Sequence, residues 1–168
     1  QVRRDPEERR PHGLQGAVEV PGAEAVAAVS SPVITPAHAG YRLMRTQKRG
    51  SIICVASDAA KVATPGEVLI GAGMAAITMF CRGLAIEAKR DGIRVNCITP
   101  SIVRDTPLYD ALMQDDFSHK LFAKAEALAS LGVVAPDEIA TLAAFLAGPD
   151  SVKLTGQTIS VNGGISAA

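Results

Sequence analysis

Two short apolar runs, separated by a long helical segment, restrict this chain to a small set of folds. Residues 51–57 (SIICVAS) form a continuous apolar run rich in β-branched side chains, and residues 93–98 (IRVNCI) form a second one. Apolar runs without polar alternation predict strands that are covered on both faces, as in a parallel sheet. Residues 71–90 between them predict a helix that ends at the turn Asp91-Gly92. This strand-helix-strand order indicates an α/β fold.

Strands and helices alternate along the rest of the chain as well. Residues 1–15 are charged and predict a flexible arm, whereas residues 16–168 predict a single α/β domain. Thr35 and Pro36 predict the cap and first residue of a helix that reaches Lys48. The other predicted elements are a possible strand at 17–20, helices at 23–30, 108–114, 117–131 and 136–148, and a last strand at 157–161.

The composition argues against several classes of function. The chain has 17 basic and 17 acidic residues, so no net charge attracts it to nucleic acid or to a membrane surface. It has no apolar run long enough for a bilayer, and we expect a cytoplasmic protein. Cys54, Cys81 and Cys97 lie in apolar runs, and the three histidines are scattered. This pattern predicts buried thiols in a reducing compartment and no metal site.

Residues 71–76 (GAGMAA) imitate a dinucleotide-binding fingerprint. The two glycines and Ala76 have the spacing GxGxxA, and Asp91 follows Gly71 by twenty residues. A true fingerprint follows a strand, but only three apolar residues precede Gly71, and no predicted strand ends at Asp91. We therefore interpret the small residues of this segment as a smooth helix face for close packing.

Five segments in a consistent order resemble the second half of a short-chain dehydrogenase/reductase. They are the helix before GSIICVAS, the GIRVN strand, the loop at Pro100, the helix APDEIATLAAFLAG and the ending LTGQTISVNGG. The resemblance runs from about Thr35 to Ile165. It implies a three-layer, Rossmann-like α/β fold with a parallel sheet. That fold would be truncated in its N-terminal half, because residues 1–50 lack the Gly-rich turn that holds a pyrophosphate.

The same resemblance locates the positions of the catalytic groups. In this family a serine at the end of a strand is followed after thirteen residues by a tyrosine, and after four more by a lysine. The tyrosine is the acid/base, the lysine lowers its pKa and holds the ribose, and the serine positions the carbonyl. Here Ser57 is retained, but Ile70 and Met74 occupy the tyrosine and lysine positions. Neither side chain can ionise, so we expect no catalytic residue in this chain.

The cofactor loop that the resemblance implies is altered too. Its glycine is replaced by Ser101, and Thr106 is displaced by one residue. Val103 and Thr106 are the only candidate cofactor contacts, and we expect no cofactor in this chain. NAD or NADP would belong to a catalytic partner.

The resemblance also implies where subunits meet, namely at helices 35–48 and 71–90 and at the C-terminal strand 157–164. The favoured hypothesis is an inactive subunit that supports an active NAD(P)-dependent short-chain dehydrogenase/reductase in a homo- or hetero-oligomer. The alternative is an active alcohol or ketone oxidoreductase with a rearranged site, and a third possibility is a truncated product.

A rearranged site would need replacements for the missing tyrosine and lysine. Tyr41, Tyr109 and Lys61 are the residues that could serve, with Ser57 and Thr106 as helpers. We expect each of the three to have a packing or surface role instead. The substrate is left open, because the apolar stripe within residues 100–131 also suits a helix that packs on the sheet.

Overall fold

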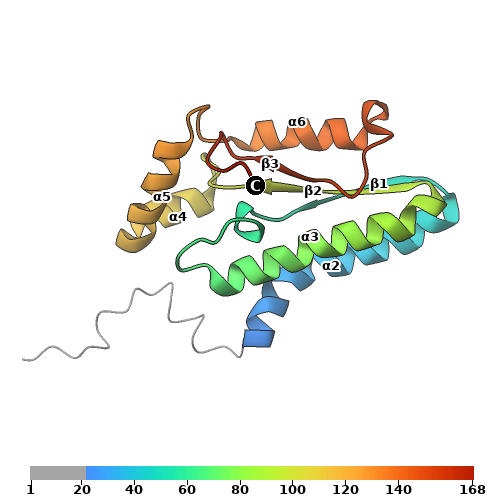
Figure 1. The fold of residues 1–168 in the computed structure, drawn as a ribbon, viewed down its shortest axis with the longest axis horizontal. Coiled ribbons are helices and arrows are strands. Elements are labelled where there is room, and N and C mark those ends of the chain that lie inside the picture. The colour runs from blue at the N-terminus through green and yellow to red at the C-terminus, as the bar shows by residue number, and fades with distance from the viewer. Residues whose placement is uncertain (1–21) are drawn as a thin grey trace, which may run out of the picture.

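A parallel three-stranded sheet forms the centre of the fold (Figure 1). The computed structural model describes residues 22–168, so the predicted arm 1–15 and strand 17–20 lie outside the described residues. The strands β1 (Gly50–Val55), β2 (Ile93–Pro100) and β3 (Thr158–Val161) lie in the order β1-β2-β3. Cys54 pairs with Cys97, which in turn pairs with Thr158. The predicted parallel sheet is confirmed.

Helices cover both faces of this sheet and produce three layers. Figure 1 shows α2 (Gly22–Gln47) and α3 (Val68–Ala88) side by side on one face and α6 (Pro136–Ala147) on the other. The remaining helical segments are α4 (Pro107–Gln114) and α5 (Asp116–Leu128), near the carboxyl end of β2, and the short 3₁₀ turns η2 (Asp58–Ala60), η3 (Lys89–Asp91) and η4 (Pro149–Ser151). The three-layer, Rossmann-like architecture agrees with the sequence prediction.

The prediction of two helices at 23–30 and 35–48 is wrong, because α2 is one continuous helix. Pro32 and Pro36 both lie inside it, and Thr35 is a helical residue rather than a cap. Each proline removes one backbone hydrogen bond, which normally breaks a helix. Here the helix continues because its inner face is packed: Ser30 and Tyr41 are buried on either side of the prolines. Tertiary packing therefore overrides the local signal.

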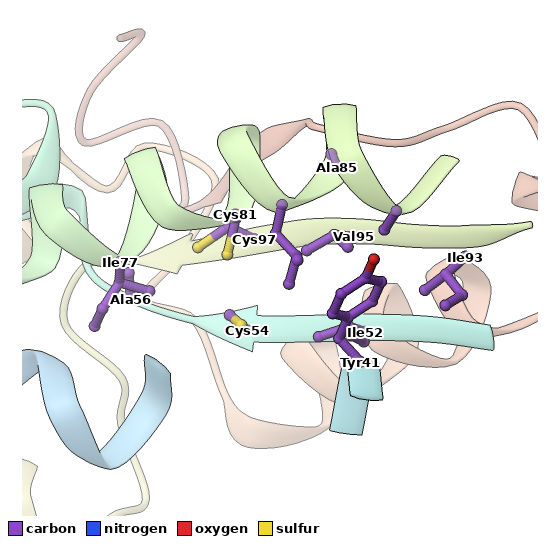
Figure 2. Close-up of a cluster of buried hydrophobic side chains, with 12 residues drawn as sticks. Tyr41, Ile52, Cys54, Ala56, Ile77, Cys81, Ala85, Ile93, Val95 and Cys97 are labelled. Carbon is purple, nitrogen blue, oxygen red and sulfur yellow. The ribbon is translucent and has the colours of Figure 1, made fainter. Parts of the chain in front are cut away.

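The main core lies between the sheet and the α2–α3 layer (Figure 2). Ile77, Cys81 and Ala85 on α3 are 0% exposed, as are Val95 and Cys97 on β2. All three cysteines of the chain are free and buried, which confirms their prediction as small core side chains. The core contains little aromatic volume, so close approach of the layers has to supply the packing.

A buried carboxylate joins the end of α2 to the turn before β2. Asp91 is 4% exposed and accepts hydrogen bonds from Lys48 Nζ at 2.5 Å and Tyr41 Oη at 3.2 Å. Arg45 Nε lies 3.4 Å away. The hydrogen bond from Lys48 is the main reason that the pKa of Asp91 is lowered. Gly92 follows at φ 71°, where a Cβ would lie 2.5 Å from Lys48 O, so only glycine fits this turn.

The segment Val68–Asp91 is long and apolar enough to cross a membrane by length and composition alone. This differs from the expectation that the chain has no such run. One face of α3 nevertheless packs on the sheet, with Ile77, Cys81 and Ala88 at 0% exposure. The segment is therefore a layer helix of the α/β fold, and its small apolar residues serve helix packing.

Candidate functional site at the carboxyl edge of the sheet

Ser57 lies just beyond the end of β1, at the carboxyl edge of the sheet. In open α/β sheets this edge is where ligands bind. The Ser57 backbone is extended (φ −147°, ψ 158°), and its Oγ accepts a hydrogen bond from the Ala59 N–H at 3.2 Å. The hydroxyl thus caps the short turn η2. Ser57 therefore has a local structural role, the simpler interpretation of a serine at the end of a strand.

The first turns of α3 lie directly against the loop that carries Ser57. A Cβ placed on Gly71 would be 2.9 Å from Ala59 O, so this contact requires glycine. Ile70 and Met74 are one helical turn apart and so lie on the same side of α3. Ile70 is 40% exposed, whereas Met74 packs against the core. The two residues flank Gly71, where α3 meets the loop that carries Ser57, and neither adds a group that could transfer a proton.

A buried polar network, which the sequence reasoning missed, ties this loop to the end of the chain. Asp58 is 5% exposed. Its carboxylate accepts hydrogen bonds from Ser160 Oγ at 3.1 Å, Asn162 Nδ2 at 2.5 Å and Ser166 Oγ at 2.9 Å. Lys61 Nζ lies 3.7 Å from Asp58 Oδ1 and also donates to Ser160 Oγ. We call these five residues the Asp58 network.

Lys61 is the cation nearest to Ser57 in sequence, and its ammonium group is bound within the Asp58 network. The Lys61 side chain is 12% exposed, and its Nζ also donates to Ala168 O at 2.8 Å. No hydrogen bond joins Lys61 to Ser57 among the described residues. A signal for the network existed: Asp58 follows β1 directly, Asn162 follows β3 directly, and parallel strands end at one edge. Lys61 therefore holds the two strand ends together.

The two candidate cofactor contacts, Val103 and Thr106, are used by the local structure. Thr106 caps α4: its Oγ1 accepts from the Tyr109 N–H at 3.1 Å and donates to Val103 O at 3.0 Å. Val103 forms an isolated parallel bridge with Val134. The Tyr109 hydroxyl donates to Glu126 Oε1 at 2.5 Å, and this hydrogen bond raises the pKa of Tyr109. Tyr109 therefore fastens α4 to α5 and is poorly suited to act as a base.

The segment 71–76 lies inside α3 and follows a loop rather than a strand. A Cβ on Gly73 would be 2.7 Å from Val29 Cβ and Cγ1 on α2, so this glycine permits close helix contact. Asp91 ends a 3₁₀ turn and accepts hydrogen bonds from Tyr41 of α2 and from Lys48, which follows α2. The close-packing interpretation is confirmed at Gly71 and Gly73, and the segment lacks the strand that a dinucleotide fingerprint needs.

Within residues 22–168, no group of three or more His, Cys, Asp or Glu side chains is arranged to hold a metal ion. The described part of the chain also has no Gly-rich turn between a strand and a helix, which is the element that receives a pyrophosphate. The residues at the carboxyl edge are mostly engaged with one another.

Comparison with known proteins identifies the origin of this architecture. The sequence model described as enoyl-(acyl carrier protein) reductase matches residues 23–166. The chain belongs to the short-chain dehydrogenase/reductase family. Among curated members of this family, a tropinone reductase homologue of Arabidopsis thaliana is 34% identical over 126 residues, which is 75% of this chain and 40% of that protein. Momilactone A synthase of Oryza sativa subsp. japonica is 36% identical over 137 residues, 80% of this chain and 49% of that protein.

Solved short-chain dehydrogenase/reductase structures share the fold. A 3-oxoacyl-[acyl-carrier protein] reductase from Brucella melitensis has a TM-score of 0.73 and 26% identity, covering 99% of this chain and 56% of that one. A gluconate 5-dehydrogenase from Burkholderia cenocepacia, solved with NADP and tartrate, has a TM-score of 0.67 and 29% identity, covering 76% of this chain and 49% of that one. The chain thus spans about half the length of these relatives, which agrees with a fold truncated relative to a whole family member.

Proposed function

We propose that this chain is a catalytically inactive subunit that associates with, and supports, an active NAD(P)-dependent short-chain dehydrogenase/reductase. The observation that carries the proposal is the pair Ile70 and Met74, which flank Gly71 where α3 meets the loop that carries Ser57. The close packing of α3 against the loop that carries Ser57 is kept, because Gly71 has no Cβ that would clash with Ala59 O. At the two positions where relatives have the acid and the lysine that lowers its pKa, this chain has Ile70 and Met74, which cannot ionise.

The state of the neighbouring polar residues supports the same proposal. Lys61 is held by the Asp58 network, and Tyr109 is held by Glu126. Tyr41 is buried and bonded to Asp91, at the opposite end of β1 from Ser57. Each residue that could replace the missing acid or lysine is therefore committed elsewhere. The active oxidoreductase with a rearranged site has no feature of the described residues in its favour.

The cofactor and the location belong to the same proposal. NAD or NADP is bound by the catalytic partner and not by this chain, because the described residues offer no pyrophosphate cradle. The partner docks on the outer face of α2 and α3 and on the C-terminal segment around β3. Three free thiols in the core suit the reducing cytoplasm, where we place the complex.

The test is a titration of the purified chain with NADH and NADPH, read by the fluorescence of the reduced nicotinamide. We expect no saturable binding and no turnover by the chain alone. An active family member should co-elute with it and should account for all binding and activity in the mixture. Saturable binding by the chain alone, with turnover that Ser57→Ala abolishes, would refute the proposal and establish the oxidoreductase.

A double variant, Ile70→Tyr/Met74→Lys, restores the family's two ionisable groups and isolates their contribution. We expect it to fold, because Ile70 is half exposed and a lysine stem can follow the path of Met74. It should still fail to bind nicotinamide, since the described residues offer no pyrophosphate cradle. Turnover by the double variant would contradict this expectation, because it would show that the tyrosine and the lysine alone are enough to restore activity.

A further inference from the structure

The outer face of the α2–α3 layer carries an apolar stripe that is exposed to solvent. On α3, Met79 is 63% exposed and Ile86 is 66% exposed, two helical turns apart on the same side. On α2, Leu43 is 71% exposed. Gly83, which lies between Met79 and Ile86, has nothing within 4 Å of the position of a Cβ. A stripe of this kind suits close contact with another protein.

The same layer is strongly basic, although the whole chain is neutral. Residues 22–49 and 68–91, which comprise the two helices and their C-terminal turns, contain seven basic and three acidic residues, a net charge of +4. The remaining described residues, 50–67 and 92–168, contain six basic and ten acidic residues, a net charge of −4. The molecule is therefore polarised, with its positive pole on the α2–α3 layer.

Several of these cations are free to meet a partner. Arg42, Arg82 and Arg90 are exposed and, among the residues that the structure describes, take part in no ion pair. Arg82 and Arg90 flank the stripe formed by Met79 and Ile86, and Arg42 is adjacent to Leu43 on α2. The acidic Asp91 is already neutralised by Lys48 and Arg45. The apolar stripe is thus bordered mainly by positive charge, with Glu87, which follows Ile86, as an exposed carboxylate on the same helix.

We infer that the α2–α3 face binds an acidic helical face of a different protein chain and rejects a second copy of itself. A two-fold symmetric dimer places the same patch on both sides of the interface. Two such faces would bring together two layers that each have a net charge of +4, and like charges across an interface oppose binding. A partner with an apolar centre and a carboxylate border would instead complement both features. The apolar stripe favours a protein over a polyanion such as DNA.

This inference rests on the proposed function and specifies the partner as a hetero-subunit. It can be tested without knowing that partner, by making an acidic copy of the same face. The variant Arg42→Glu/Arg82→Glu/Arg90→Glu keeps the stripe and changes the charge of the layer from +4 to −2. Its matched control, Lys120→Glu/Lys124→Glu/Lys153→Glu, makes the same change in net charge with exposed residues outside the layer.

The masses are measured by sedimentation velocity in low and high salt. The wild type and the acidic variant should each sediment as single chains of 17.4 kDa, and their equimolar mixture as a dimer. The mixture should bind at least about tenfold tighter than either chain alone and should weaken about tenfold in high salt. The control variant mixed with wild type should remain monomeric. Circular dichroism verifies folding, and Arg42→Glu/Arg82→Glu replaces the triple variant if the latter fails to fold.

Three results would overturn the inference. One is a wild-type dimer that Met79→Glu abolishes, because the face would then accept its own copy. Another is a mixture that remains monomeric. The third is a wild-type assembly that grows beyond two copies at low salt. It would mean that the α2–α3 face binds the acidic side of another copy of the same chain. None of these results affects nicotinamide binding, so the proposed lack of catalysis stands or falls separately.

Discussion

Close approach of α2 and α3 at Gly73 provides a quantitative test of the packing. A Cβ at this position would lie 2.7 Å from Val29 Cβ and Cγ1 and 3.2 Å from Val26 O. In an unstrained helix, replacing glycine by alanine stabilises by about 1 kcal/mol. Overpacking a tight contact costs about 1–3 kcal/mol. We therefore expect Gly73→Ala to destabilise the chain by about 1 kcal/mol.

The same helix contains the matched control. Gly83 has nothing within 4 Å of its would-be Cβ, so Gly83→Ala should stabilise the chain by about 1 kcal/mol. Trimming the opposing side chain should rescue the first variant: Val29→Ala/Gly73→Ala should be about 1–2 kcal/mol more stable than the sum of its single variants predicts. The sign of each effect follows from the presence or absence of a neighbouring atom.

Urea unfolding followed by circular dichroism measures these differences, with the slope checked for constancy between variants. For a chain of this size, 1 kcal/mol shifts the melting temperature by about 2–4 °C. Equal stabilisation by Gly73→Ala and Gly83→Ala would refute the argument, because it would mean that α2 and α3 are not in contact at Val29.

Two further predictions concern the buried carboxylates. Because the pKa of Asp91 is lowered, its contribution to stability is complete above the ordinary aspartate value of 3.8 and is lost as the pH falls through the lower folded value. Urea midpoints from about pH 6 to about pH 3 should fall more steeply for wild type than for Asp91→Asn; parallel curves would contradict this pKa shift. Replacing Asp58 by Ala leaves Lys61 unpaired and should cost about 3 kcal/mol, while amide hydrogen exchange in residues 162–168 accelerates. Unchanged exchange there would show that the Asp58 network does not hold the end of the chain.

The sequence by itself determined the fold class and the inventory of possible chemistry. Continuous apolar runs at 51–57 and 93–98 required strands covered on both faces, and the segment between them required a helix. The absence of ionisable groups at positions 70 and 74 is likewise a property of the sequence. These features can be predicted from the sequence because the apolar pattern of a strand and the chemistry of a side chain are local properties.

Only the tertiary structure decided which local signals prevail and which polar residues meet. Pro36 marks a helix start in the sequence, yet it lies inside α2, because the burial of Ser30 and Tyr41 stabilises the helix across it. Asp58 and Asn162 are 104 positions apart, and their hydrogen bond exists because parallel strands end at the same edge. The basic pole also depends on the fold: two helices of modest charge become one positive face only when they lie side by side, since electrostatic potentials add in space and not along the sequence.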